Sequence, residues 1–332
     1  MSSKNPVTIL IFHQKYTPEL TIQPTQLNQL QTEFGQIKWK IVEKIEHYFD
    51  AMVEAEIIWS NVFPIQYPAN MSKLQWYQTT TTHTGGTIPE IAFQKRLTMT
   101  NSRSVYAQNA SEMVMGYLLS LAKQFSTLWT AQQNKHWMFL NEFTEKHRIQ
   151  SLNGKKLGIL GFGAIGQATA KKAKYFGMKV LASDIRKDLP VSELDGFYLN
   201  DPSPIFSESD FVLISIPSCS QTKGLVNDRL LAQMKESACL INLSPANVLD
   251  EDYLYNMLKY KDIPAAVLDC TNLQPLPPIH PLYQLDNIFI TPHVACYDEQ
   301  ILEKLVDHFA TNLKYFLAGK PLNDPIINYD YP

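Results

Sequence analysis

The chain of 332 residues is long enough for two domains, because single hydrophobic cores stop growing below that length. Hydrophobic residues make up 45% of it and charged residues 18%, and no apolar run is long enough to cross a bilayer, so a membrane-embedded protein is excluded. The formal net charge is -3 with both signs interspersed, which excludes the basic stripe that nucleic-acid binding requires.

The N-terminal stretch MSSKNPVTILIFHQKY has no basic region followed by an apolar core and a small-residue cleavage site, which predicts a cytoplasmic protein. Four cysteines lie far apart and form no CxxC pair and no short Cys/His spacing: Cys219, Cys239, Cys270 and Cys296. They predict neither a disulfide framework nor a metal site, and we expect reduced, mostly buried thiols.

The first hundred residues contain short strand-like runs, namely VTILIFH, IKWKIVE, AEIIWS and LQWYQTT. Polar segments separate these runs, and one of them, TIQPTQLNQLQTEFG, is compatible with a helix. This pattern predicts an α/β domain.

A long helix is predicted over SEMVMGYLLSLAKQFSTLWTAQQ, which begins at Ser111. Apolar side chains recur there every four residues and predict one buried face, made of Met113, Tyr117, Leu121, Phe125 and Trp129. Asn109 and Ser111 are the candidate N-cap residues.

Strands and helices then alternate strictly. The nearly all-apolar strands are KLGIL, KVLASD, FVLISIP, ACLINLS, AAVLDC and NIFITPH, and helices are expected after KLGIL, near NDRLLAQMK and at EDYLYNMLKY. Apolar strands that alternate with helices predict a parallel sheet covered on both faces. The tail EQILEKLVDHFATNLKYFLAG predicts a further amphipathic helix, which Gly319 ends.

A glycine-rich turn, GFGAIG, follows the first strand of this alternating half and precedes its helix. In this setting, Gly161 permits a tight turn, Gly163 lets the backbone approach a pyrophosphate, and Gly166 lets the helix pack on the strand. The N–H groups near Ala164 and Ile165 are then available to the phosphates. The alternative is a tight turn that binds nothing.

Asp184 lies eighteen residues beyond Gly166, at the end of the next strand. A carboxylate there accepts hydrogen bonds from a ribose diol and repels a 2'-phosphate, so NAD is predicted as cofactor in preference to NADP. Arg186 and Lys187 are close by and weaken that preference.

From Thr100 onward the sequence resembles the D-2-hydroxyacid dehydrogenase family. The stretches that carry the resemblance are TNSRSVYAQNASEMVMGYLLSLAK, LNGKKLGILGFGAIGQATAKKAKYFGMKVLASD, DFVLISIPSCSQTKGLVNDRLLAQMKESACLINLS and ITPHVACYDE. The resemblance implies an α/β fold in which a Rossmann-like doubly wound parallel sheet is inserted into a second, flavodoxin-like α/β substrate domain. It implies a substrate domain of residues 1–103 and 298–332, an NAD-binding domain of residues 104–297, and a homodimer built largely on the latter.

Members of this family use an Arg that holds the substrate carboxylate, a His that acts as acid and base, and a carboxylate that orients the His. By resemblance, His293 in ITPHVA is the acid/base, and Asp269 in AAVLDC meets the nicotinamide carboxamide. Pro217, which ends FVLISIP, is a further predicted cofactor contact. The alternatives are a structural His293 and an ordinary Asp269 at a strand end.

Two catalytic positions depart from the family pattern. INLSPA puts Pro245 where relatives carry Arg, and a proline has no guanidinium to offer. NLQP puts Gln274 where Glu is expected. Gln274 can accept a hydrogen bond from His293 but cannot stabilise an imidazolium as a carboxylate does, which predicts a less basic histidine. Formate dehydrogenases of the superfamily are similar in having Gln before Pro, although they keep the Arg.

The predicted substrate loop is the third departure, because QTTTTHTGG replaces a glycine-rich turn of the relatives. It brings Thr82, His83 and Thr84 toward the predicted site, although an exposed surface-loop histidine is the commoner explanation of His83. Arg103 is a candidate to replace the missing Arg.

Two hypotheses follow. In the first, the chain is an NAD-dependent oxidoreductase that transfers hydride between nicotinamide and a 2-hydroxy acid, a 2-keto acid or a related altered substrate. In the second, it is a catalytically impaired NAD-binding relative that serves as a sensor or interaction protein. Turnover of any carbonyl substrate distinguishes the two.

Overall fold

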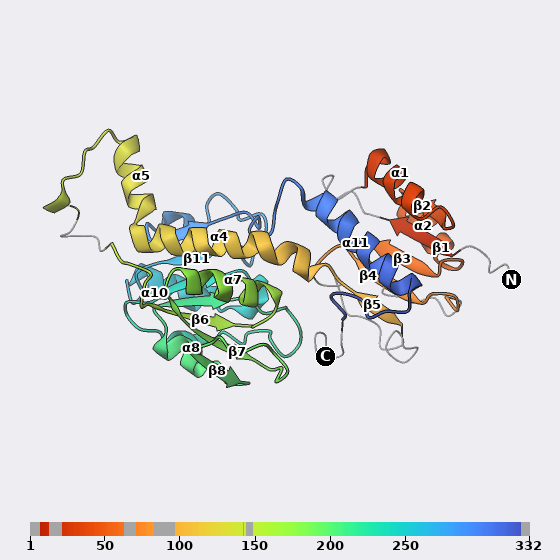
Figure 1. The fold of residues 1–332 in the computed structure, drawn as a ribbon. Coiled ribbons are helices and arrows are strands. Elements are labelled where there is room, and N and C mark those ends of the chain that lie inside the picture. Colours follow the sequence, from red (N-terminus) through yellow and green to blue (C-terminus); the bar gives the residue numbers. More distant parts are fainter. Residues whose placement is uncertain are drawn as a thin grey trace. The chain divides into compact units, whose positions relative to one another are not determined.

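The structure is a computed structural model, and it describes residues 7–12, 22–62, 71–82, 97–141, 143 and 149–326. The chain forms two compact units. The first comprises Met1–Tyr106 and Asp298–Pro332, and the second comprises Ala107–Tyr297 (Figure 1).

The first unit contains one parallel sheet and three helices among its described residues. Its elements are β1 (Thr8–Phe12), α1 (Pro24–Glu33), β2 (Lys38–Ile41), α2 (Ile45–Met52), β3 (Ile57–Ser60), β4 (Trp76–Thr79), β5 (Thr98–Thr100) and α11 (Ile301–Leu317). The strands pair in the order β2-β1-β3-β4-β5. This is the flavodoxin-like strand order, as predicted.

Apolar burial explains these elements. Ile9 to Phe12 of β1 and Ile57 to Ser60 of β3 are buried on both faces of the sheet. The predicted amphipathic helix is confirmed as α11, whose Phe309 stacks on Trp59 and Trp76 at centroid distances of 4.4 Å and 5.4 Å. Gly319 follows the helix with a φ of 65°, the left-handed conformation that ends a helix at low cost.

The second unit carries the larger sheet. Its strands are β6 (Lys156–Leu160), β7 (Lys179–Asp184), β8 (Gly196–Leu199), β9 (Phe211–Ile214), β10 (Cys239–Asn242), β11 (Ala266–Leu268) and β12 (Ile288–Ile290). They are all parallel and lie in the order β12-β11-β10-β9-β6-β7-β8. Numbered from β6, this is the doubly wound Rossmann order with one additional strand.

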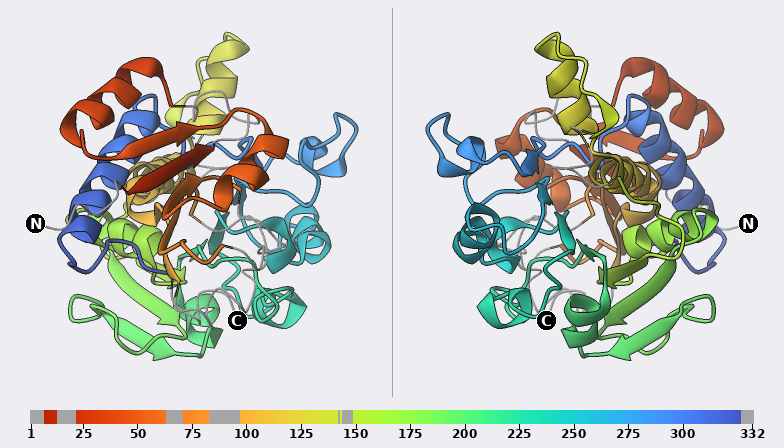
Figure 2. Two further views of the ribbon diagram at one scale, coloured as in Figure 1. Left: turned by 90° about the vertical axis from the view of Figure 1, so that its right-hand side faces the viewer. Right: turned by 90° about the vertical axis from the view of Figure 1, so that its left-hand side faces the viewer.

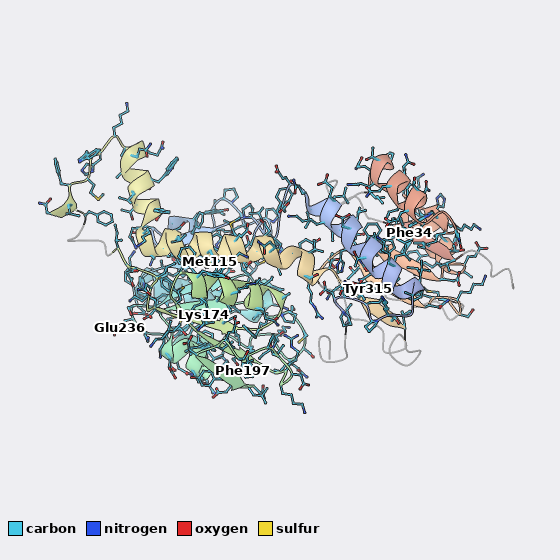
Figure 3. All side chains as sticks on the ribbon, viewed as in Figure 1. Phe34, Met115, Lys174, Phe197, Glu236 and Tyr315 are labelled. Atoms are coloured by element: carbon cyan, nitrogen blue, oxygen red, sulfur yellow. The ribbon has the colours of Figure 1, made fainter. Side chains whose placement is uncertain are left out.

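Helices cover both faces of this sheet. The helices of this unit are α4 (Arg103–Lys123, which starts in the first unit), α5 (Phe125–Gln133), α7 (Ala164–Tyr175), α8 (Ser203–Glu208), α9 (Asp228–Leu231), α10 (Glu251–Lys259) and the short η2 (Ala246–Val248) and η3 (Pro281–Gln284), of which α5 does not lie on the sheet. Neighbouring residues of a strand point alternately into two hydrophobic clusters, one on each face of the sheet. Leu240 belongs to the first cluster, with residues of α10, and Ile241 belongs to the second cluster, with residues of α4 and α7. Met115 of α4 belongs to the second cluster (Figure 3). The prediction of a sheet covered on both faces is confirmed.

The predicted long helix is wrong in two respects. It starts eight residues earlier than Ser111, at Arg103, so Asn109 and Ser111 are interior residues and not N-caps. It also breaks at Gln124, whose φ of 57° is left-handed. α5 therefore leaves the line of α4 and projects from the unit (Figures 1 and 2). Phe125 and Trp129, predicted as buried, are 51% and 64% exposed.

Short elements escaped the sequence patterns, namely β5, β8, α2 and α8. Each has three to eight residues, too few for an unambiguous period. Cys239 and Cys270 are buried, Cys219 and Cys296 are half-buried, and all four are free thiols. Within the described residues, no helix has the length and apolar character needed to cross a membrane.

Candidate functional site

Parallel strands end at the same edge of a sheet, and in the second unit this edge collects polar and special residues. Those that lie at a strand end or within three residues of it are Gly161 after β6, Asp184 at the end of β7, Pro217 after β9, Pro245 after β10, Asp269 after β11 and His293 after β12. The fold therefore places six of the predicted positions along one edge.

The glycine turn has the geometry that its sequence predicts. Gly161 has a φ of 94°, and a Cβ on it would lie 2.7 Å from the Ser215 carbonyl oxygen. A Cβ on Gly166 would lie 2.4 Å from the Gly161 carbonyl oxygen, so the close approach of α7 to the turn needs a glycine. Gly163 is the N-cap of α7, and no side chain caps the helix there. The first N–H groups of α7, at Ala164 and Ile165, thus remain as donors at a positive helix end.

Asp184 is held by Arg186 as well as by the backbone. Its Oδ1 accepts from Arg186 Nε, and its Oδ2 accepts from Arg186 Nη2 and from Phe162 N–H, at 2.9, 2.9 and 2.8 Å. Burial alone would raise the pKa of Asp184, but the hydrogen bonds and charge of Arg186 outweigh it and lower that pKa. The same guanidinium lies over the turn, since its Nη2 is 3.7 Å from where a Gly163 Cβ would be.

His293 and Gln274 form a hydrogen-bonded pair. The distance from His293 Nδ1 to Gln274 Oε1 is 3.2 Å, and Gln274 Nε2 donates to the Thr271 carbonyl, also at 3.2 Å. Because the amide nitrogen is committed to Thr271, the oxygen faces His293, and an amide oxygen can only accept. His293 therefore carries a hydrogen on Nδ1, which leaves Nε2 of this exposed ring free to take or give a proton.

The backbone of His293 is in the left-handed region, with a φ of 57°. Such a conformation costs a non-glycine residue on the order of 1 kcal/mol and persists only when its surroundings impose it. Its N–H reaches the carbonyl oxygens of Asp269 and Thr291, both at 2.9 Å.

Asp269 supports the residues around His293. The side chain is 3% exposed, and its Oδ1 accepts from Thr291 Oγ1 at 2.7 Å, from Val294 N–H at 3.0 Å and from Ala295 N–H at 3.1 Å. Within the described residues, its Oδ2 accepts a single, longer hydrogen bond from Ala295 N–H, at 3.2 Å. The predicted contact of Asp269 with a carboxamide stays a prediction, and Oδ2 is the oxygen with capacity for it.

Pro245 begins η2 in an extended conformation, with φ -53° and ψ 146°. The adjacent side chains are all neutral: Asn242 caps Ser244, whose hydroxyl accepts from Ile216 N–H, and Asn247 donates to Ser218. In the described part of the unit, no ion pair or hydrogen bond joins a Lys or Arg to Pro245, Gln274 or His293. The strand ends next to His293 are thus uncharged except for Asp269.

In the first unit, the segment after β4 is held by the residues that lead into α4. Four successive carbonyl oxygens each accept one hydrogen bond: Thr79 from Ser102 Oγ, Thr80 from Tyr106 Oη, Thr81 from Ser102 N–H and Thr82 from Asn101 Nδ2, at 2.8, 2.7, 3.0 and 3.1 Å. The structure thus gives Thr82 a fixed backbone, whereas His83 and Thr84 lie outside the described residues.

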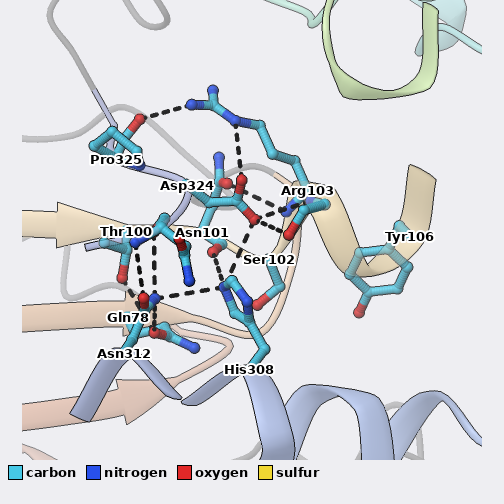
Figure 4. Close-up of polar contacts among 12 residues, drawn as sticks. Gln78, Thr100, Asn101, Ser102, Arg103, Tyr106, His308, Asn312, Asp324 and Pro325 are labelled. Carbon is cyan, nitrogen blue, oxygen red and sulfur yellow. Dashed lines mark hydrogen bonds and ion pairs between the residues drawn. The ribbon is translucent and has the colours of Figure 1, made fainter. Parts of the chain in front are cut away.

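Arg103, the candidate substitute for the missing Arg, is engaged within the first unit. Its Nη2 donates to the Pro325 carbonyl at 2.8 Å, and its Nε lies 3.7 Å from Asp324 Oδ1 (Figure 4). His308 lies 3.6 Å from the same carboxylate. The role of Arg103 toward a substrate stays a prediction.

Sequence reasoning missed one polar contributor near His293 and correctly predicted Cys270 as a reduced, buried thiol. Tyr117 was predicted only as part of an apolar stripe, yet its hydroxyl lies 2.8 Å from Thr291 Oγ1. Burial and the charge of Asp269 raise the pKa of Cys270 to about 12, so this thiol is neutral and unreactive. A tyrosine in an apolar stripe was the available signal, because a buried hydroxyl requires a partner. No metal-ligand cluster occurs among the described residues.

Comparison with known proteins identifies the same region. The sequence model of "D-isomer specific 2-hydroxyacid dehydrogenase, NAD binding domain" matches residues 115–295. The chain is 31% identical over 240 residues to a glyoxylate reductase of Thermofilum pendens, a match that covers 70% of this chain and 68% of that protein. It is 31% identical over 230 residues to a glycerate dehydrogenase of Methylorubrum extorquens, covering 68% of this chain and 71% of the relative.

A solved structure of a D-isomer specific 2-hydroxyacid dehydrogenase family protein from Aeromonas salmonicida is similar over 97% of this chain and 99% of its own. Its TM-score is 0.74 and its sequence identity 26%. The similarity in fold therefore includes both units.

The Asp184–Arg186 pair predicts how this chain distinguishes NADH from NADPH. The parent should bind NADH more tightly, because Asp184 can accept from a ribose diol. Arg186→Ala should weaken NADPH binding further, by about 10-fold, since it removes the cation that neutralises Asp184 and could meet a 2'-phosphate. Calorimetric titration of both cofactors measures this ratio. Lys187→Ala is the control, and a larger effect of that variant would mean that Arg186 is the wrong residue.

Proposed function

Because this chain belongs to the D-isomer specific 2-hydroxyacid dehydrogenase family, we propose that it is an NAD-dependent oxidoreductase that uses His293 as its acid and base. It interconverts a 2-hydroxy acid and a 2-keto acid, or a related substrate that needs no arginine at position 245. The observation that carries the proposal is the His293–Gln274 pair, held at the same sheet edge as an intact glycine turn.

The residues of the second unit fit a dinucleotide. Gly163 leaves open space that a side chain would fill, α7 presents uncapped N–H groups, and Asp184 is positioned for a ribose. NAD supplies the hydride acceptor or donor of the reaction. Pro217 and Asp269 would complete the cofactor contacts at the strand ends.

His293 handles the proton that accompanies hydride transfer. In oxidation, its neutral Nε2 accepts the hydroxyl proton of the substrate while Gln274 holds Nδ1–H. In reduction, the protonated ring donates from Nε2 to the forming alkoxide. Gln274 Oε1 accepts from Nδ1–H in both states, so the amide fixes the ring orientation throughout the cycle without adding a negative charge.

The second candidate function is a catalytically impaired NAD-binding protein that acts as a sensor or interaction partner. Pro245 favours it, because loss of a positioned cation can reduce transition-state stabilisation by several kcal/mol, on the order of 10² to 10³ in rate. Ordinary 2-keto acids should be poor substrates for either candidate.

The first unit, which includes the substrate loop predicted around Thr82 and His83, is proposed as the substrate domain and the second as the cofactor domain, with the boundaries predicted at 103/104 and 297/298. A homodimer is proposed on the surface of α5 and the segment after it. Six large apolar side chains there are 40% to 82% exposed: Phe125, Leu128, Trp129, Trp137, Phe139 and Leu140. Exposed apolar patches of this kind mark protein interfaces. The cytoplasmic location stays a prediction.

Replacing Gln274 with Glu tests the role of His293. The new carboxylate would face Nδ1 and favour the charged ring, so His293 would keep its proton to higher pH. The pH at which carbonyl reduction falls should rise by about one unit. Steady-state rates across pH, compared for the parent and Gln274→Glu, measure the shift. An unchanged profile would show that another group supplies the proton.

Replacing Pro245 with Arg separates an altered enzyme from a disabled one. The φ and ψ of Pro245 are open to any residue, so Arg adds no backbone strain, and its fork can meet a carboxylate in two hydrogen bonds. Pro245→Arg, alone or with Gln274→Glu, should raise kcat/KM for glyoxylate or pyruvate by about 10-fold. We expect partial rescue, because the bulk of QTTTTHTGG also limits small substrates. Strong turnover by the parent would mean that another residue already supplies the cation.

Trp129→Glu tests the proposed homodimer. A charge in the middle of the α5 surface should raise the dimer dissociation constant by at least about 100-fold, since burying an unpaired carboxylate costs several kcal/mol. Sedimentation velocity over a concentration series measures the constant. Tyr175→Glu, at an even more exposed aromatic residue on α7, should leave it unchanged. A parent that sediments as a monomer at all concentrations would contradict the proposal.

A further inference from the structure

Two hydroxyl groups and one carboxylate form a continuous hydrogen-bond chain that runs from α4 to the loop that carries His293. Tyr117 Oη lies 2.8 Å from Thr291 Oγ1, and Thr291 Oγ1 lies 2.7 Å from Asp269 Oδ1. A carboxylate can only accept, so Thr291 gives its single hydroxyl hydrogen to Asp269. Thr291 must therefore accept from Tyr117, and every hydrogen-bond direction in the chain is determined.

The two ends of this hydrogen-bond chain are buried, and Thr291 between them is half-buried. Tyr117 is 2% exposed and Asp269 is 3% exposed. The Tyr117 ring also packs edge-on against Phe289, at a centroid distance of 5.8 Å and an interplanar angle of 81°. Burial raises the pKa of Tyr117 to about 12, so the phenol remains a donor near neutral pH. Hydrogen bonds in such low-dielectric surroundings are stronger and strengthen one another.

The hydrogen-bond chain ends at Asp269, which holds the backbone on both sides of His293. Asp269 holds Thr291 before the histidine and Val294 and Ala295 after it, while the Asp269 carbonyl accepts from His293 itself. Asn109, also on α4, donates to the carbonyl oxygens of Ala295 and Tyr297. The left-handed conformation of His293 thus lies between two attachments to one helix.

We propose that Tyr117 is a positioning residue for His293: through Thr291 it orients the Asp269 carboxylate, which holds the loop so that the imidazole faces Gln274. This inference rests on the proposed function, in which His293 is the acid and base. It assigns a role to a helix residue that touches neither the imidazole nor Gln274 in any hydrogen bond of the described residues. Loss of the Tyr117 hydroxyl should allow the loop to relax, so that the His293 ring populates both neutral tautomers.

The first experiment needs no substrate. Nitrogen NMR of histidine-labelled protein reports which ring nitrogen carries the proton, with the His293 signals assigned by their loss in His293→Asn. The parent should show His293 with its proton on Nδ1. Tyr117→Phe and Thr291→Val, which keep their shapes but lose one hydroxyl, should each show a mixture of tautomers. Thr291→Ser, which keeps the hydroxyl, should retain the parent signal.

Tyr198→Phe is the matched control, because Tyr198 donates a hydroxyl hydrogen bond to Glu208 from β8, at the opposite edge of the same sheet. It should leave the His293 signals unchanged. Thermal unfolding of each variant identifies any that fails to fold, and Thr291→Val tests the same chain independently of Tyr117. Parent-like His293 signals in both Tyr117→Phe and Thr291→Val would overturn the proposal.

The second experiment uses whichever of glyoxylate, pyruvate and hydroxypyruvate the parent reduces fastest with NADH. Tyr117→Phe should lower kcat by on the order of 10-fold and leave KM for NADH unchanged, because a misplaced acid affects the chemical step and not cofactor binding. An unchanged kcat would overturn the proposal. A parent that turns over none of the three keto acids would restrict the proposed function to the related substrates that need no arginine at position 245, while the NMR result would still decide whether Tyr117 positions His293.

Discussion

The second unit depends on a buried negative charge, the carboxylate of Asp269. An ionised carboxylate without partners would cost several kcal/mol at this depth, and Asp269 avoids that cost by accepting hydrogen bonds from a threonine hydroxyl and two backbone N–H groups. All of these donors belong to the loop after β12. The need to satisfy the charge therefore fixes the loop, and the loop fixes His293.

Two carboxylates at the same edge are satisfied in different ways. Asp184 is neutralised by the guanidinium of Arg186, whereas Asp269 is surrounded by neutral donors. Among the described residues, the cofactor end of the edge therefore has a cation bonded to its carboxylate, and the histidine end has none. Pro245 and Gln274 keep this second end neutral. Such a site can position a proton and a nicotinamide, yet it offers weak recognition of a substrate carboxylate from within this unit.

The fold was predictable because it rests on patterns that extend over many residues. Apolar strands alternating with helices, together with the glycine turn, indicated a Rossmann-like unit, and the sheet order confirms it. The predicted α4 was wrong beyond Gln124, since an apolar stripe with helical spacing does not reveal whether its partner is the core or another molecule. Phe125 and Trp129 continue the stripe and are nevertheless exposed.

The site was predictable only in part. His293, Gln274 and Pro245 could be located from short motifs at strand ends, because strand ends converge in any parallel sheet. The links between Tyr117, Thr291 and Asp269 could not, because they join residues that are 22 to 174 positions apart. The ion pair between Arg186 and Asp184 was likewise not predictable, because the sequence shows that the two residues are close but not that their side chains are bonded.

Transfer of deuterium from labelled NADH tests most directly whether this site is catalytic through His293. In single-turnover reactions with the protein in excess over a panel of 2-keto acids, the parent should deliver deuterium to C2 of the product. His293→Asn should bind NADH equally well and slow that transfer by on the order of 10² to 10⁴. A parent that binds NADH and transfers no deuterium to any substrate, or an unimpaired His293→Asn variant, would contradict the account.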